Sequence, residues 1–150
     1  MLNKKAYTIV ELLASIVILG LLATLAYMGV SKYFNKALDT TYKNFEENIK
    51  TAATNYLLDN SNYIPKKNGS LVIDASKLIC DGYLDDLEDP KNESKTCNID
   101  SYVIVKRDND NNLDMTYQAC LKCSDYQSDI CSTSINNIER LRKDEACEVE

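Results

Sequence analysis

The chain of 150 residues has no histidine and no tryptophan. The absence of histidine excludes a Ser-His-Asp or Cys-His catalytic arrangement and every metal site with a histidine ligand. Glycine and proline are scarce, with four and two residues, and neither occurs between residues 30 and 60. That stretch therefore contains none of the residues that most often break a helix.

The chain also lacks a basic stripe. It carries 17 basic and 23 acidic residues, for a net charge of −6, and its lysines are scattered among acids. A protein of this kind is a poor candidate for direct binding to nucleic acid or to anionic lipid. We expect no direct nucleic-acid partner. The length suits one small domain with a helical anchor.

Charge is missing altogether from residues 12–30, a run of nineteen mostly apolar residues. A helix of that length spans roughly 30 Å, which is the thickness of the hydrocarbon core of a membrane. Glu11 lies at the mouth of this run, shortly after a basic segment at residues 1–6 that holds Lys4 and Lys5. An acid within a spanning segment costs about 2.5–3.5 kcal/mol at the helix centre. We therefore expect Glu11 to have a partner.

These features follow one another in a recognisable order: a basic leader ending in a small residue, an aromatic residue, Thr, two aliphatic residues, Glu and Leu-Leu. The sequence reads Lys4-Lys5-Ala6 and then Tyr7-Thr8-Ile9-Val10-Glu11-Leu12-Leu13. This segment resembles the N-terminus of the type IV pilin and type II secretion pseudopilin family. Two positions depart from the family pattern, since Ala6 replaces the usual Gly and Met28-Gly29 stands where many members have Pro.

The resemblance implies a structural subunit and not an enzyme, with no cofactor and no metal. A prepilin peptidase would cut between Ala6 and Tyr7 and methylate the new amino group of Tyr7. Glu11 would then act in assembly. The implied division is a leader at 1–6, a membrane and fibre-core helix at 7–31, and a pilin-like globular domain at 32–150. Secretion, competence and motility machines share this signature, and the sequence leaves the choice open.

The same resemblance implies partners and a location. The partners would be further copies of the chain and other pilin-like subunits in a helical fibre, the peptidase, a membrane assembly platform and, before assembly, lipid. The chain would cross the inner or cytoplasmic membrane once, with its N-terminus inside. Assembly would place it in a cell-surface or periplasmic fibre. Lys4 and Lys5 favour this orientation.

Beyond the charge-free run the pattern becomes amphipathic. Apolar residues recur at helical spacing on one stripe: Leu38, Tyr42, Phe45, Ile49, Ala52 and Tyr56. On the other side, Glu46 and Lys50 lie one turn apart and can pair. We predict one helix over about residues 8–58. Its second half needs a partner surface to cover the apolar stripe.

Composition and turn signals divide the remainder into short elements. We predict a short strand at 70–74, a short helix or turn at 75–84, strands at 101–106 and 113–121, and a turn at 108–112. Ser132-Thr133-Ser134 could cap a last helix over about 135–142. The expected fold is α+β, with the long helix packed on a small antiparallel sheet, as in pilins.

The six cysteines all lie after the apolar run: Cys80, Cys97, Cys120, Cys123, Cys131 and Cys147. Disulfides persist outside the membrane, and a domain of this size gains stability from them. Six cysteines allow 15 pairings, among which sequence alone does not choose. Our working choice is Cys80 with Cys97, and the other four cysteines paired among themselves.

Other interpretations remain open at this point. Cys120 and Cys123 form a CxxC, which could be a redox pair, and with Cys131 and Cys147 could bind zinc. Residues 108–114 offer Asp108, Asp110 and Asp114 as calcium ligands, but lack the glycine and closing glutamate of an EF-hand. Cleavage after Ala26, as in a secretory signal, would instead release a soluble disulfide-stabilised binding domain.

Overall fold

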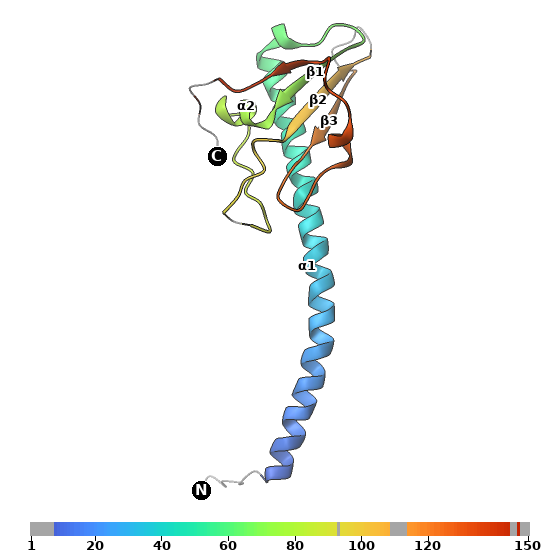
Figure 1. Ribbon diagram of the computed structural model, residues 1–150, viewed down its shortest axis with the longest axis vertical. Coiled ribbons are helices and arrows are strands. Elements are labelled where there is room, and N and C mark those ends of the chain that lie inside the picture. Colours follow the sequence, from blue (N-terminus) through green and yellow to red (C-terminus); the bar gives the residue numbers. More distant parts are fainter. Residues whose placement is uncertain (1–7, 93, 109–113, 145–146, 148–150) are drawn as a thin grey trace. The chain divides into compact units, whose positions relative to one another are not determined.

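The computed structural model describes residues 8–92, 94–108, 114–144 and 147, with Met28 described in its backbone alone. The chain divides into two units, Met1–Asp39 and Thr40–Glu150, which are described separately. The elements in chain order (Figure 1) are α1 (Ile9–Asp59), the 3-10 turn η1 (Ser61–Tyr63), β1 (Gly69–Asp74), α2 (Ala75–Cys80), β2 (Tyr102–Arg107), β3 (Met115–Cys120), η2 (Asp129–Ser132) and β4 (Glu139–Leu141).

The long helix α1 confirms the predicted helix over residues 8–58. It begins after Thr8, whose carbonyl accepts a hydrogen bond from Leu12 N–H at 3.1 Å. It ends at Asp59, where the backbone N–H and side-chain amide of Asn60 both donate to the Tyr56 carbonyl, at 2.9 and 3.0 Å. Asparagine competes for backbone partners in this way, which explains the stop without a glycine.

The four strands form one sheet in the order β3-β2-β1-β4. The pairs β1–β2 and β2–β3 are antiparallel, in the registers Gly69 opposite Arg107 and Tyr102 opposite Cys120. The central residues of β1 and β2 are almost fully buried, at 0–1 % exposed. This explains why both strands read as continuous apolar runs and not as alternating ones. The predicted strands at 70–74, 101–106 and 113–121 are confirmed.

The predicted helix over 135–142 is wrong, because Glu139–Leu141 forms β4 instead. β4 pairs in parallel with Leu71–Ile73 and so covers the edge of β1 that would otherwise be open. Arg140 holds it there, since its Nε donates to Asp74 Oδ1 at 2.7 Å and its guanidinium lies 5.6 Å from the centre of the Tyr102 ring. These partners are more than 35 residues away and left no local signal in the sequence.

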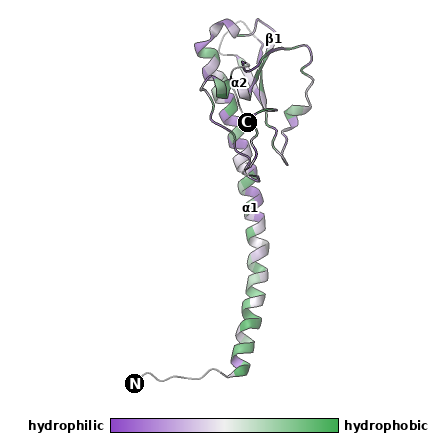
Figure 2. Ribbon diagram, turned by 60° about the vertical axis from the view of Figure 1, so that its left-hand side comes forward, coloured by the Kyte–Doolittle hydropathy of each residue, from purple (hydrophilic) through white to green (hydrophobic). Residues whose placement is uncertain are grey.

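Within the unit Thr40–Glu150, α1 packs on the sheet through the predicted stripe. Tyr42, Ile49, Ala52 and Tyr56 are each at most 3 % exposed, while Phe45 is half-buried. Burying one large apolar side chain stabilises a fold by about 1.5–3 kcal/mol. In Figure 2, green (apolar) residues dominate the N-terminal part of α1, and they alternate with purple ones further along the helix.

Three disulfides join Cys80 to Cys147, Cys97 to Cys123 and Cys120 to Cys131. The expected pairing of Cys80 with Cys97 is therefore wrong, and of the other four cysteines only Cys120 and Cys131 pair with each other. Contacts between distant segments decide the pairing, and the sequence alone does not reveal them. One such contact is the Lys77 Nζ to Asp144 Oδ2 ion pair at 3.4 Å, which joins α2 to the segment that precedes Cys147.

A buried carboxylate ties three segments together. Asp89 is 1 % exposed and accepts hydrogen bonds from the Tyr42 hydroxyl of α1 at 3.3 Å, from Lys91 N–H at 3.0 Å and from Ser124 N–H at 2.9 Å. Burial alone would raise the pKa of Asp89, but these donors outweigh it and hold the pKa below its usual value. The charged form of Asp89 is therefore part of the folded structure.

The substitution Asp89→Asn tests this role in the detergent-solubilised chain. Because the pKa of Asp89 is lower folded than unfolded, its contribution is complete above the unfolded value of about 3.9 and is lost as pH falls toward the folded value. At pH 7 the variant should lose about 1–3 kcal/mol of unfolding free energy, since an amide cannot accept all three hydrogen bonds. Urea titrations at several pH values measure both effects.

The exposed Asp100→Asn is the matched control and should change the unfolding free energy little. Asp74 is common to both variants, so its pKa, which burial raises despite Arg140, cancels in the comparison. The Asp89→Asn variant should also lose less stability than the native chain below about pH 4. Equal stability of Asp89→Asn and the native chain at pH 7 would contradict the assignment.

Candidate functional site

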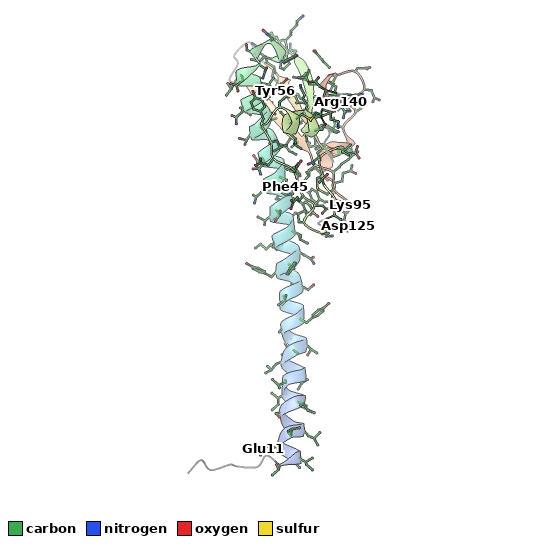
Figure 3. All side chains as sticks on the ribbon, turned by 90° about the vertical axis from the view of Figure 1, so that its left-hand side faces the viewer. Glu11, Phe45, Tyr56, Lys95, Asp125 and Arg140 are labelled. Carbon is green, nitrogen blue, oxygen red and sulfur yellow. A yellow bond between two sulfur atoms is a disulfide. The ribbon has the colours of Figure 1, made fainter. Side chains whose placement is uncertain are left out.

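The first turn of α1 places Glu11 at the third helical position. Thr8 precedes the helix, and its Oγ1 accepts a hydrogen bond from Glu11 N–H at 3.3 Å. Thr8-Ile9-Val10-Glu11 is thus the Thr-x-x-Glu pattern of a capping box, in which the hydroxyl satisfies one free N–H of the helix start. Figure 3 shows Glu11 at this end of α1. The side chain is exposed, where the positive end of the helix dipole favours a carboxylate.

Apolar side chains cover the helix surface that follows Glu11. Between Ile9 and Phe34, the large apolar side chains that the structure describes are each at least 53 % exposed. An apolar surface of this extent is far larger than monomeric proteins leave in water. Among the described residues, α1 is the one helix long and apolar enough to cross a membrane, judged by length and composition. The segment therefore needs lipid or other apolar helices around it.

The few polar side chains of this segment are compatible with apolar surroundings. Ser15 Oγ donates to the Leu12 carbonyl and Thr24 Oγ1 to the Leu21 carbonyl, each at 2.8 Å. Both hydroxyl donors are therefore satisfied within the helix, which is what a lipid environment requires. Between Thr8 and Ser31, Glu11 is the one charged residue in the sequence.

Aromatic and basic residues mark the far end of the apolar run. Tyr27, Tyr33 and Phe34 are 77, 76 and 65 % exposed, and Lys32 is the first charged residue after Glu11. Tyrosines and lysines are enriched where a spanning helix meets the headgroups. The segment from Glu11 to Lys32 thus has a polar boundary at each end.

The structure describes some of the predicted site residues and not others. Glu11 is described, whereas Ala6 and Tyr7 lie outside the described residues. Of the calcium-ligand segment, Asp108 and Asp114 are described as exposed, and residues 109–113 lie outside the described part. The described residues contain no group of three or more metal-ligating side chains.

The four cysteines considered for a redox or zinc site all belong to disulfides that such a site could not use. Cys120 and Cys123 belong to two different disulfides, so the CxxC does not form a disulfide of its own. Cys131 and Cys147 are likewise paired with Cys120 and Cys80. The structure therefore gives all six cysteines the structural role that export favours.

Sequence reasoning missed the role of Glu46. The expected pair with Lys50 does not form, because Lys50 Nζ contacts Glu47 Oε1 at 2.7 Å. Glu46 instead accepts hydrogen bonds from the Tyr126 hydroxyl at 2.9 Å and from Ser128 Oγ. The Tyr126 ring stacks on Tyr42 with 4.2 Å between ring centres. These partners lie about 80 residues away, so nothing nearby in the sequence signalled them.

Comparison with known families gives one match. Residues 1–27 match the Prokaryotic N-terminal methylation motif. No curated protein and no solved structure matches the chain. The matched segment contains Thr8 and Glu11 and the beginning of the exposed apolar surface described above. The chain thus carries a prepilin-type N-terminal methylation motif at residues 1–27, joined to a pilin-like α+β fold with three disulfides.

Proposed function

We propose that the chain is a pilin or pseudopilin, a structural subunit of a type IV pilus-like fibre used in secretion, competence or motility. The observation that carries the proposal is the matched motif, which runs without a break into an exposed apolar helix with Glu11 as its one internal charge. Subunits of this kind are generally not enzymes. Residues 1–6 would be the leader, 7–31 the membrane and fibre-core helix, and 32–150 the globular domain.

The first step in this function is storage in the membrane. The apolar surface of residues 12–30 would lie in lipid, with Lys4 and Lys5 on the cytoplasmic side and the disulfide-bonded unit outside. A prepilin peptidase would then cut between Ala6 and Tyr7 and methylate the amine of Tyr7. Processing adds a second charge, the new amine, at the same end of the helix as Glu11.

Electrostatics explains how this pair could set the register of a fibre. The Tyr7 amine would lie four residues, or about 6 Å along a helix, from Glu11. In a bundle of stacked helices, the amine of one subunit can approach the carboxylate of its neighbour. An unpaired charge is costly in an apolar core, and attraction between opposite charges is far stronger there than in water. The pair would therefore favour the one axial position that brings both charges together.

Transfer of the helix from membrane to fibre costs little hydrophobic free energy. Lipid tails and the surfaces of neighbouring helices are both apolar, so the exposed leucines and isoleucines exchange one apolar environment for another. The assembly platform would supply direction and energy. The Tyr7 amine and Glu11 would supply the specific contact that lipid lacks.

A membrane-tethered or secreted domain acting alone is the alternative. The three disulfides and the buried core of Thr40–Glu150 would serve such a domain as well. Release by a signal peptidase after Ala26 would cut α1 within its hydrogen-bonded run, because the helix is continuous from Ile9 to Asp59. The start of the mature chain distinguishes these outcomes.

The intact mass of the membrane-extracted protein should correspond to a chain that begins at Tyr7 and carries one extra methyl group. The cleavage depends on a small residue before the cut, so Ala6→Phe should keep the full-length mass in the same membranes. Ala26→Phe is the matched control and should be processed like the native chain. A mass that begins at Met1 or at Tyr27 in the native chain would contradict the proposal.

Substitutions at Glu11 separate its charge from its part in the helix cap. Glutamine can fill the same capping-box position but carries no charge. We expect Glu11→Gln and Glu11→Leu to insert and to be cleaved normally, yet to reduce fibre yield at least about tenfold. The reason is that each leaves a neighbour's amine unpaired, at a cost of about 3–5 kcal/mol when buried. Electron microscopy and sedimentation of sheared fibres measure the yield.

Glu47→Gln is the matched control, because Glu47 lies on the exposed side of the same helix. It should assemble like the native chain. Normal fibres from Glu11→Gln with none from Glu11→Leu would assign Glu11 to helix capping and would remove the proposed charge pair.

A further inference from the structure

Two of the three disulfides of the globular unit, Cys97–Cys123 and Cys120–Cys131, cross along the chain, and Cys80–Cys147 encloses both. In chain order the cysteines are Cys80, Cys97, Cys120, Cys123, Cys131 and Cys147, and the pairs are first with last, second with fourth, and third with fifth. Each of the three disulfides therefore skips at least one nearer cysteine. Oxidation of neighbours as they become available would give a different set.

Loop closure favours that different set in the unfolded chain. Cys80 and Cys97 are 17 residues apart and Cys120 and Cys123 are three apart, whereas the native separations are 67, 26 and 11. The probability that two ends meet falls with about the 3/2 power of loop length, so Cys80 should meet Cys97 about eight times more often than Cys147. Export during synthesis adds to this bias, because Cys97 is closer to the membrane helix than Cys147 and emerges first.

Burial then prevents late correction. Cys97 and Cys120 are 1 % and 0 % exposed, and Cys120 lies on β3 opposite Tyr102 of β2. Thiol–disulfide exchange needs a thiolate to reach a sulfur atom. Once the unit has folded around them, these two sulfur atoms are out of reach. Wrong disulfides must be rearranged before that folding is complete.

We propose that this chain is a substrate of a thiol–disulfide isomerase, a partner that must act after export and before the sheet closes. The proposal rests on the export in the proposed function, since thiols inside the cell are kept reduced. It concerns maturation of the globular unit and does not involve Glu11 or the fibre contact.

The chemistry is balanced in two stages. A disulfide oxidant takes two electrons and two protons for each disulfide it forms, and first yields Cys80–Cys97 and Cys120–Cys123. The isomerase thiolate then attacks the sulfur of Cys80, which releases Cys97 as a thiolate and forms a mixed disulfide. The thiolate of Cys147 attacks the same sulfur and releases the isomerase. Cys97 and Cys123 pair by the same exchange, with no net oxidation, and Cys120 and Cys131 are left as thiols. The disulfide oxidant then takes two electrons and two protons from Cys120 and Cys131 and forms the third native disulfide.

Refolding of the reduced full-length chain in detergent micelles tests the proposal. Glutathione disulfide alone is compared with glutathione disulfide plus a purified thiol–disulfide isomerase in its reduced form. Acid quenching and peptide mapping by mass spectrometry identify the pairs over time. With oxidant alone, Cys80–Cys97 and Cys120–Cys123 should predominate. The isomerase should raise the rate of formation of the three native pairs at least tenfold.

Two double variants provide matched controls. Cys97→Ser with Cys123→Ser removes one partner from each competing pair, and the closest remaining cysteines, Cys120 and Cys131, are a native pair. This variant should reach its two native disulfides without the isomerase. Cys80→Ser with Cys147→Ser keeps the competition between Cys120–Cys123 and Cys120–Cys131, so it should still need the enzyme.

Rapid formation of the native pairs by oxidant alone would overturn the proposal, as would equal dependence of both double variants on the isomerase. Neither result would bear on the proposed function, because refolding does not require processing or assembly. A fibre defect in Glu11→Gln would conversely leave the isomerase proposal intact.

Discussion

The structure depends on one constraint, which is that α1 must meet two different surroundings without interrupting its own hydrogen bonds. Its backbone donors and acceptors are hydrogen-bonded within the helix, so the polarity of the side chains determines which surroundings each part of it suits. Residues 12–30 are apolar on every side and suit lipid or a helix bundle. The part that belongs to Thr40–Glu150 is apolar along one stripe and suits a sheet. The scarcity of glycine and proline makes this continuity possible.

Glu11 has two roles, one in the start of the helix and one as a charged group, and different measurements detect each of them. As the third residue of the helix and the last of the capping box, it helps to define where α1 begins, through the hydrogen bond from its own N–H to Thr8. It is also a carboxylate beside a long uncharged surface, and in apolar surroundings it needs an opposite charge, which the helix cap does not supply. The proposed amine of Tyr7 on a neighbouring subunit would supply that charge. A residue at the helix start is well placed for both roles, because the charge then lies at the edge of the apolar surface.

Local patterns were enough for much of the fold. The uncharged run, the stripe from Leu38 to Tyr56 and the absence of Gly and Pro together predicted the length of α1. The stripe also predicted the face that packs on the sheet, and the apolar runs of β1 and β2 predicted strands. The motif around Glu11 was equally readable, because helix position and charge are properties of neighbouring residues. What failed was non-local. β4, the disulfide pairs and the hydrogen bonds of Glu46 each depend on residues that are far apart in sequence.

Most of these non-local contacts involve the last third of the chain. Residues 120–147 supply β4, a partner for each of the three disulfides, the hydroxyl groups that donate to Glu46 and one of the three hydrogen-bond donors to Asp89. The segment has little regular structure of its own. Contacts with elements that precede it fix its backbone. In a chain exported as it is synthesised, those elements would be outside the membrane first. The segment that completes the unit would therefore arrive last, when α1 and the first two strands can already offer their buried faces and Cys80 and Cys97 are already exposed to oxidation.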